Sequence, residues 1–357
     1  MGSSKKTLVK IGSNVLTLSS GLPDKERIAH LVNQMAELKT EGHQIILVSS
    51  GAVAAGRNIV KNAKGLDTIS QRQVLASVGQ AELMKIYSHF FQEHNIVCSQ
   101  VLVSKESFRT RQHYLNIKNC LDALLKSDII PIINENDVVS ITELMFTDND
   151  ELSGLVASMM AVENMLLLSN VDGIFTSHPN EPTAKLIGEY TENGVDLEKI
   201  ISDTKSAFGR GGMLSKAETA KKIAGFGVNV SIGNGTKNGI LKALLNRESG
   251  TFFKANNRTT SPIKKWVAQA GDFSKACICV NEGAKKALLS EKASSLLPIG
   301  VTAINGSFKK GDVVNITDEN NKNIGLGKVA YDSDKAKICL GKRDCTPLVH
   351  YNYLVLK

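Results

Sequence analysis

The sequence predicts an α/β protein: a three-layer αβα sandwich with a mainly parallel sheet, followed by a small β-barrel-like domain. Apolar runs of strand length alternate with helical apolar spacing over about 250 residues, an order that predicts parallel strands joined by right-handed crossovers. Beyond residue 253 the pattern changes to short strand-like pieces separated by glycines, which is typical of a small β domain. The length of 357 residues also favours two domains.

The segment that follows Asp24 has the apolar spacing of a helix. Its apolar residues recur every three or four positions, and Gly42 ends it as a C-terminal cap. The same reasoning predicts these elements in order: strand 7–11, helix 24–42, strand 44–48, helix 52–57, helix 71–91, strand 96–103, helix 114–126 and strand 129–133.

The stretch from Ile129 to Asp150 combines a buried strand with an unusually polar end. Four hydrogen-bonding residues, Asn134 to Asp137, directly follow the apolar run, and open α/β sheets bind ligands at the carboxyl ends of their strands. Polar residues return at Asp148 to Glu151, just before apolar residues at helical spacing. A helix cap alone would explain the second cluster, but it would not explain the first.

The alternation continues to about residue 253 and then gives way to the second domain. The first part adds strand 165–168, helix 212–224, strand 228–232 and helix 239–245. The polar stretch 255–262 has the composition of a linker, so we expect one domain at 1–254 and another at 263–357. For the second domain we expect strands 266–268, 276–280, 313–316, 328–331 and 353–356, with a helix at 282–289.

Composition limits the class of protein. No apolar run approaches the roughly 20 residues that cross a bilayer, and the N-terminus lacks a signal-peptide pattern, so we expect a cytoplasmic protein. The six cysteines lack the spacing of a zinc site. Most of the net charge of +8 lies in residues 255–357, where 16 Lys and Arg face 9 Asp and Glu. This excess of positive charge is suited to binding a polyanion such as RNA, but it is equally typical of an ordinary solvated surface rich in lysine.

Three turns at the expected strand ends are suited to anions. Lys10 to Ser13 places a cation beside a glycine, Ser50-Gly51 opens a helix, and Gly209 to Lys216 places a lysine one turn inside another helix. Helix N-termini bind carboxylates and phosphates, and cations neutralise the charge that develops in phosphoryl transfer. No Gly-x-x-x-x-Gly-Lys-Ser/Thr loop occurs, which excludes the common P-loop kinases.

These residues stand in motifs that resemble the amino acid kinase family, and within it the glutamate 5-kinases. The basic segment from about Ile263 resembles the PUA domain that many bacterial members carry. The resemblance covers nearly the whole chain and rests on Lys10–Ser13, Ser49–Arg57, Pro131–Asp137, Asp148–Asp150 and Gly211–Lys216. It implies ATP-dependent phosphorylation of the γ-carboxylate of L-glutamate to L-glutamyl 5-phosphate, the first step of proline biosynthesis. It also implies Mg²⁺ held mainly by the nucleotide phosphates, feedback inhibition by proline, and a homo-oligomer, either a tetramer or a dimer.

The resemblance also implies roles for individual residues. Lys10 and Lys216 would stabilise the transferring phosphoryl group, and Asp150 would hold both lysines. Glutamate would bind Ser50, Gly51, Asn134, Asp137 and Asn149, with Asp137 facing the ammonium group. The nucleotide would bind Lys10, Gly12, Ser13, Ser169, Asn170, Arg210, Gly211, Gly212, Met213 and Lys216. No protein ligand for a metal is expected.

Three positions depart from the family pattern. Ser169-Asn170 stands where Thr-Asp is usual, and both Arg210 and Ser13 replace a common threonine. These departures leave the contacts to the nucleotide base open. Glu143 lies in the loop that usually governs sensitivity to proline.

Two alternatives stay open at this point. One is a kinase for another small amino acid or carboxylate, such as N-acetylglutamate or aspartate. Asp137 argues against N-acetylglutamate, because an acylated amine offers no charge for a carboxylate to meet. The other is an RNA-binding protein that acts through its basic C-terminal domain, although no aromatic residues of the kind used for base stacking alternate with its lysines.

Overall fold

The structure is a computed structural model that describes residues 5–61, 65–140, 146, 148–177, 181–191, 212–256, 261–271, 274, 276–290 and 294–356. The chain divides into two compact units. The first comprises Met1–Ser104 and Lys118–Thr259, and the second comprises Lys105–Ile117 and Thr260–Lys357. No helix within the described residues is both long and apolar enough to cross a membrane.

The first unit is built on an eight-stranded sheet in the order β3-β4-β2-β1-β5-β7-β8-β6. All neighbouring strands pair in parallel except β7 and β8, which are antiparallel. Their bounds are β1 (Lys6–Ile11), β2 (Gln44–Ser49), β3 (Cys98–Val103), β4 (Ile130–Glu135), β5 (Asn164–Ser169), β6 (Glu189–Tyr190), β7 (Asn229–Asn234) and β8 (Thr251–Phe253).

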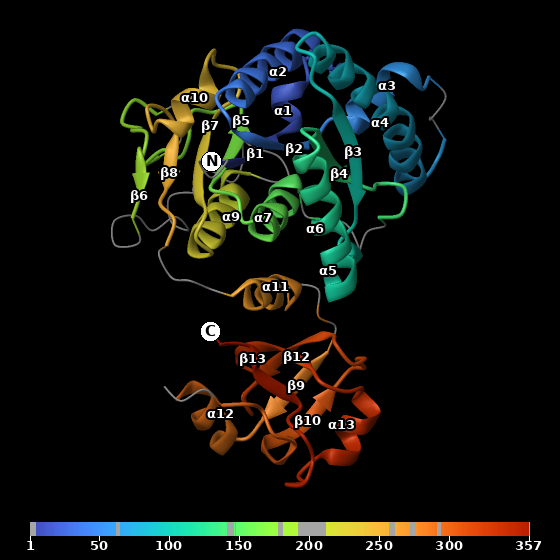
Figure 1. The fold of residues 1–357 in the computed structure, drawn as a ribbon, viewed down its shortest axis with the longest axis vertical. Coiled ribbons are helices and arrows are strands. Elements are labelled where there is room, and N and C mark those ends of the chain that lie inside the picture. Colours follow the sequence, from blue (N-terminus) through green and yellow to red (C-terminus); the bar gives the residue numbers. More distant parts are fainter. Residues whose placement is uncertain are drawn as a thin grey trace. The chain divides into compact units, whose positions relative to one another are not determined.

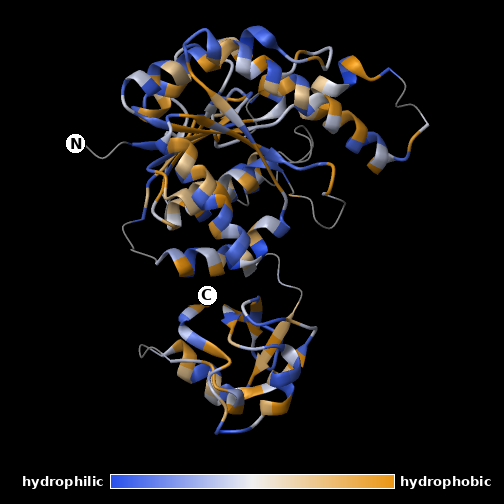
Figure 2. Cartoon of the chain, turned by 45° about the vertical axis from the view of Figure 1, so that its right-hand side comes forward, coloured by the Kyte–Doolittle hydropathy of each residue, from blue (hydrophilic) through white to orange (hydrophobic). Residues whose placement is uncertain are grey.

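Helices cover both faces of this sheet, so the predicted three-layer sandwich is confirmed. Figure 1 shows α2 and α10 on one face and α7 and α9 on the other. Figure 2 shows hydrophobic colouring concentrated on the central strands, with hydrophobic and hydrophilic residues mixed along the helices. The helix bounds are α1 (Ser13–Leu16), α2 (Lys25–Thr40), α3 (Ala52–Ile59), α4 (Thr68–Gln92), α6 (Arg111–Lys126), α7 (Asn149–Met160), α9 (Met213–Gly225) and α10 (Ile240–Leu245).

The side-chain alternation of β1 directs one charged residue away from the main core. Val9 and Ile11 are fully buried in a core that β1 shares with α2 and α10. Because successive side chains of a strand point to opposite faces, Lys10 points toward the face on which α7 packs against β1. This arrangement places an ammonium group beneath the start of α7.

The second unit contains a five-stranded sheet in the order β10-β9-β11-β12-β13. Its pairs are antiparallel except β9 with β11, and Ile278, Val314 and Val349 form part of its own buried core. A small C-terminal β domain was therefore predicted correctly. Its elements are α5 (Glu106–Arg109), α11 (Pro262–Ala270), β9 (Cys277–Val280), α12 (Glu282–Leu289), η2 (Pro298–Gly300), β10 (Val301–Asn305), β11 (Val313–Thr317), β12 (Asn323–Val329), α13 (Ser333–Cys339) and β13 (Val349–Leu356).

The predicted strand at 266–268 is wrong, because these residues lie inside helix α11. Ser261 caps this helix by accepting a hydrogen bond from the Lys264 amide at 3.3 Å, and Pro262 occupies its first turn, where proline is favoured. Trp266 is 1% exposed, and its Nε1 donates to the Phe108 carbonyl at 3.1 Å. That contact belongs to the second unit, which includes residues 105–117.

Strand β12 begins earlier than the predicted strand at 328–331. Its start carries Gly325 and Gly327, residues that weaken a strand in isolation. A Cβ atom on Gly327 would lie 2.5 Å from a methyl carbon of Val349 on neighbouring β13. Close packing between β12 and β13 therefore requires a glycine at this position. The same glycine weakens the strand pattern in the sequence, which is why the start of β12 was not predicted.

Candidate active site

The predicted site residues gather where neighbouring parallel strands of the first unit end. Strands β4, β2, β1 and β5 are adjacent in the sheet. Their carboxyl ends carry Asn134 on β4, Ser50 directly after β2, Lys10 on β1 and Ser169 on β5. Helices α7 and α9 begin beside these strand ends, with Asn149 and Met213 as their first residues.

Asp148 joins the starts of α7 and α9. Its Oδ1 accepts hydrogen bonds from the amides of Asp150 at 2.9 Å and Glu151 at 3.1 Å, which caps α7. Its Oδ2 accepts from the hydroxyl of Ser215, on α9, at 2.7 Å. The helix segments that carry Asp150 and Lys216 are therefore fixed against each other.

Asp150 binds two lysines that come from distant parts of the chain. Lys216 Nζ donates to Asp150 Oδ2 at 2.8 Å, and Lys10 Nζ forms an ion pair with Oδ1. The side chains of Lys10, Asp150 and Lys216 are 4%, 1% and 11% exposed. The structure thus brings together the three residues predicted to be catalytic.

In this cluster two lysine amines share the carboxylate of Asp150, and the negative charge of Asp148 also acts on Lys10. Burial opposes ionisation of Asp150, but the two lysine charges outweigh it and lower the pKa of this carboxyl. Burial, together with the positive charge of Lys216, lowers the pKa of Lys10, although Asp150 acts in the opposite direction. Two ammonium groups fixed side by side in a shielded site can bind an anion between them.

Two glycines directly adjoin the elements that carry the lysines. A Cβ atom on Gly12 would lie 3.6 Å from Lys10 Nζ, so the glycine keeps space open beside this amine, and Ser13 follows as the first residue of α1. Gly212 occupies the N-cap position of α9, immediately before Met213, and provides no side-chain cap. The first amides of α9 are suited to a phosphate.

Asn149 connects the predicted substrate-binding residues. Its Nδ2 donates to the Ser50 hydroxyl at 2.9 Å, to Asn134 Oδ1 at 3.0 Å and to the Ser49 carbonyl at 3.2 Å. Asn134 Nδ2 in turn donates to Gln80 Oε1 on α4 at 2.9 Å, a partner that sequence reasoning missed. The network therefore joins the ends of β2 and β4 to α7.

Gly51 begins helix α3 directly after Ser50. Its φ is +104°, a backbone conformation that is strained for any residue with a Cβ atom. The tight turn allows α3 to start beside the Asn149 network.

Asp137 has a partner that the sequence did not indicate. Its Oδ1 accepts hydrogen bonds from Arg72 Nε at 3.0 Å and Nη2 at 2.7 Å. Asp137 also lines a hollow of about 250 Å³ together with Ala52 and Gln80. Because Gln80 binds Asn134, this hollow adjoins the Asn149 network.

The predicted nucleotide residues are only partly described. Ser169 is buried and lies opposite Asn234 in the pairing of β5 with β7, whereas Asn170 is exposed. Asn234 Nδ2 donates to Asp172 at 2.9 Å, so a further polar group that the sequence analysis missed lies near these strand ends. Arg210, Gly211 and the loop residue Glu143 lie outside the described residues.

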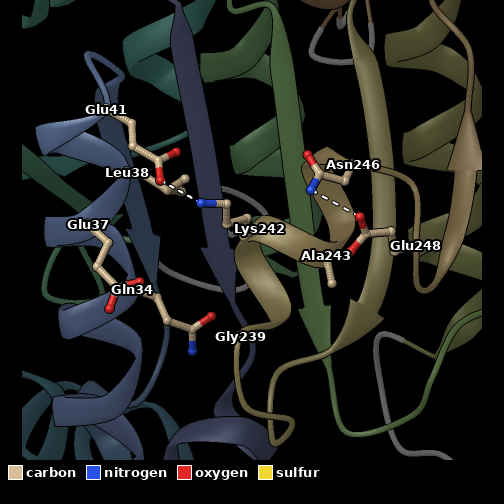
Figure 3. A pocket seen from close by; sticks show the side chains of 9 residues that line it. All are labelled: Gln34, Glu37, Leu38, Glu41, Gly239, Lys242, Ala243, Asn246 and Glu248. Atoms are coloured by element: carbon tan, nitrogen blue, oxygen red, sulfur yellow. Dashed lines mark hydrogen bonds and ion pairs between the residues drawn. The ribbon is translucent and has the colours of Figure 1, made fainter.

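A second hollow, of about 300 Å³, lies between α2 and α10. Figure 3 shows polar contacts among its side chains, in which Lys242 donates to Glu41 at 2.7 Å and Asn246 donates to Glu248 at 3.1 Å. It contains none of the motif residues. The strand ends around Asp150 are therefore the better candidate for an active site.

Comparison with protein families decides the affiliation of the chain. The model of the amino acid kinase family matches residues 5–234, which is more than half of the chain. The chain belongs to the amino acid kinase family. The PUA domain model matches residues 277–347 of this amino acid kinase, so both parts of the predicted resemblance are confirmed.

Curated relatives match this amino acid kinase along its whole length. A glutamate 5-kinase of Bacteroides thetaiotaomicron is 48% identical over 352 residues, which cover 98% of each chain. A glutamate 5-kinase of Chlorobaculum tepidum is 44% identical over 355 residues, covering 99% of this chain and 97% of the relative.

Solved structures share the fold of the kinase unit at low sequence identity. Carbamate kinase from Giardia lamblia bound to AMP-PNP aligns with a TM-score of 0.52 at 18% identity, over 72% of this chain and all of that one. An isopentenyl phosphate kinase structure aligns with a TM-score of 0.51 at 15% identity, over 70% of this chain and all of that one. These likenesses establish the fold alone.

Proposed function

We propose that this amino acid kinase transfers the γ-phosphoryl group of ATP to the γ-carboxylate of L-glutamate. The products are ADP and L-glutamyl 5-phosphate, and the reaction is the first step of proline biosynthesis. The observation that carries the proposal is the single buried carboxylate, Asp150, that holds the amines of Lys10 and Lys216 at the carboxyl edge of the sheet. The full-length relatives named glutamate 5-kinase support the choice of substrate.

The nucleophile in this reaction needs no general base. A glutamate side chain has a pKa of about 4.3 and is already ionised at neutral pH. The enzyme must therefore align its carboxylate with the γ-phosphorus and neutralise the charge on the transferring group. Lys10 and Lys216 supply that positive charge, and Asp150 keeps the two amines together.

The glutamate end of the site combines neutral donors with one carboxylate. Ser50 and the start of α3 offer hydroxyl and backbone donors, which suit carboxylate groups, and Asn149 lies beside them with its Nδ2 donating to the Ser50 hydroxyl. Asp137 suits the ammonium group. Both hydrogen bonds from Arg72 reach Asp137 Oδ1, so Oδ2 remains for the substrate.

Mg²⁺ enters this scheme as part of the MgATP substrate. Both oxygens of Asp150 face lysine amines, so this carboxylate does not suit a metal. Among the described side chains, no group of three or more His, Cys, Asp or Glu residues could hold a metal ion. The described residues therefore do not fit a resident metal, and we expect the ATP phosphates to hold the ion. Inhibition by proline and assembly into a dimer or tetramer stay predictions.

A hydroxamate assay tests the proposed function. The purified enzyme would be incubated with ATP, Mg²⁺, hydroxylamine and one acceptor: L-glutamate, L-aspartate, N-acetyl-L-glutamate or carbamate. Hydroxylamine traps an acyl phosphate as a hydroxamate, which forms a coloured complex with Fe(III), and coupled detection of ADP covers the carbamate reaction. We expect turnover with L-glutamate at a kcat/KM far above that of the other acceptors. Turnover of another acceptor without turnover of L-glutamate would overturn the proposal.

The lowered pKa of Lys10 predicts an alkaline limit to activity. Burial and the neighbouring Lys216 charge move this pKa below its ordinary value of 10.5. Lys10 is charged at pH values below its own pKa, so kcat/KM for MgATP should be at its maximum in that range. As the pH rises through the pKa of Lys10, kcat/KM should fall, and the fall should begin below pH 10.5. Bound triphosphate favours the charged amine, so kcat should fall at a higher pH than kcat/KM.

The test is a pair of pH profiles for the wild type and for Lys10→Arg. An arginine stays charged throughout the range, so the alkaline fall of kcat/KM should disappear in whatever activity the variant retains. An unchanged alkaline limb in Lys10→Arg would show that another group titrates.

A further inference from the structure

Arg72 and Asp137 form a side-chain pair between the start of α4 and the turn after β4. Arg72 donates through Nε and Nη2 to the same oxygen, Asp137 Oδ1, at 3.0 and 2.7 Å. Hydrogen bonds between charged groups are roughly twice as strong as neutral ones. Asp137 is 9% exposed, whereas the Arg72 side chain is 45% exposed, so the arginine reaches the buried carboxylate from the surface.

The start of α4 also holds the backbone of the same turn. Gln73, the next residue, donates through Nε2 to the Val138 carbonyl at 2.7 Å. The helix start is itself fixed, since Asp67 Oδ1 accepts from the amides of Ile69 and Ser70 at 3.0 Å each. The first turns of α4 therefore anchor both the side chain of Asp137 and the backbone beside it.

The orientation of the Asp137 carboxylate depends on the positive charge of Arg72, because a second carboxyl group lies nearby. Glu135 is 6% exposed, and its Oε2 lies 3.8 Å from Arg72 Nη2. Burial and the negative charge of Asp137 raise the pKa of Glu135, while Arg72 acts in the opposite direction. Without the guanidinium group, the two carboxyl groups would repel each other with no cation between them.

The pairing also selects which oxygen of Asp137 is available. Both hydrogen bonds from Arg72 reach Oδ1, and among the described residues no hydrogen bond to Oδ2 occurs. The carboxylate borders the hollow of about 250 Å³ that Gln80 also lines. Oδ2 is thus the oxygen left to accept a hydrogen bond from a ligand.

We propose that Arg72 is a positioning residue for the amino acid substrate. It clamps Oδ1 of Asp137, places a positive charge beside both this carboxylate and Glu135, and leaves Oδ2 to bind the substrate ammonium group. The inference rests on the proposed function, in which that ammonium belongs to L-glutamate. Arg72 acts through Asp137 and does not touch the transferring phosphoryl group, so its effect should be confined to substrate binding.

A double-mutant cycle with Asp137 tests this role. Arg72→Met should raise the KM for L-glutamate about tenfold, as expected for a charged hydrogen bond at a half-exposed site, with kcat and the KM for ATP within about twofold. Arg72→Lys keeps the charge and should recover part of the loss. In an Asp137→Asn background, Arg72→Met should have little further effect, because the group through which it acts is gone.

The matched control is Lys242→Met. Lys242 is also an exposed cation paired with a carboxylate, Glu41, at 2.7 Å, but it lies at the hollow between α2 and α10 (Figure 3). Its kinetics should equal those of the wild type. Thermal unfolding of each variant separates folding from binding, and Arg72→Gln replaces Arg72→Met if the latter does not fold.

Several results would overturn the inference. These are an unchanged KM in the Arg72 variants, a fall in kcat at constant KM, or an equal effect of Arg72→Met with and without the Asp137 carboxylate. The last result would indicate that Arg72 binds substrate directly. Failure of the wild-type enzyme to phosphorylate L-glutamate is a separate outcome, which would remove the proposed function and this inference together.

Discussion

Lys216→Ala should lower kcat by about a thousandfold and leave the KM for L-glutamate within about twofold. Removing a preorganised group that stabilises charge in the transition state typically costs 10²–10³ in rate. Lys216 is 11% exposed and is held by Asp150 at 2.8 Å, so its charge is both shielded from water and fixed in position. Its interaction develops with the transferring phosphoryl group, so the loss should appear in kcat.

Two companion variants make this prediction specific. Lys221 lies on the exposed side of the same helix, α9, and Lys221→Ala should behave as wild type in the same steady-state assay. Asp137→Ala should chiefly raise the KM for L-glutamate, because its carboxylate binds the substrate ammonium. If Lys216→Ala raised KM and Asp137→Ala lowered kcat, the two roles would have been assigned the wrong way round.

Asp150→Asn should reduce both activity and stability. The carboxylate is 1% exposed and binds Lys10 and Lys216, so the neutral amide would remove the buried negative charge that the two ammonium groups share. Removing one partner from a buried ion pair costs about 3–5 kcal/mol, and we expect the free energy of unfolding in urea to fall by about 3 kcal/mol. We expect kcat to fall by at least about a hundredfold, because the amines lose their fixed positions.

The pH dependence of this stability loss follows from the lowered pKa of Asp150. A depressed native pKa stabilises the fold above the ordinary Asp pKa of 3.8, and this contribution is lost as the pH falls through the native value. The difference in the free energy of unfolding between the wild type and Asp150→Asn should therefore be largest at neutral pH and should decrease under acid conditions.

Asp122 provides a matched control for Asp150. It also lies between two lysines, with Lys6 at 3.3 Å and Lys118 as its second partner, but its side chain is 25% exposed. Asp122→Asn should change the free energy of unfolding by no more than about 1 kcal/mol and leave activity unchanged. Equal losses in the two variants would show that the cluster around Asp150 has no special role.

The cluster around Asp150 could be predicted because the direction and the ends of the strands can be recognised in the sequence. Lys10, Asn134 and Ser169 each lie at the end of an apolar run, and parallel strands end at one edge of a sheet. Asp150 and Lys216 lie in the first turns of helices that follow polar or glycine-rich segments. Topology alone therefore brings these residues close together.

The partners on α4 could not be predicted in this way. Arg72 meets Asp137, and Gln80 meets Asn134, only because of how one long helix is placed beside β4. Neither residue stands in a motif, and charged or amide residues on a helix are usually ascribed to its solvated face. Contacts of this kind depend on tertiary packing, which local sequence patterns do not record.

The errors in the second unit have a similar origin. Residues 266–268 are apolar enough for a strand, but the cap at Ser261 and the burial of Trp266 at helical spacing favour α11. The segment 105–117 joins this unit through contacts such as Trp266 with Phe108, which are far apart in sequence. Short elements with few apolar residues give the weakest periodic signal, so tertiary contacts decide their structure.

The most direct test of the central claim is a crystal structure with ADP, L-glutamate and an aluminium fluoride mimic of the transferring phosphoryl group. We predict that the amines of Lys10 and Lys216 both lie within hydrogen-bond distance of this mimic, with Asp150 between them and the γ-carboxylate of glutamate in line with the ADP oxygen. A structure in which either amine faces a different cavity, or does not reach the mimic, would contradict the account.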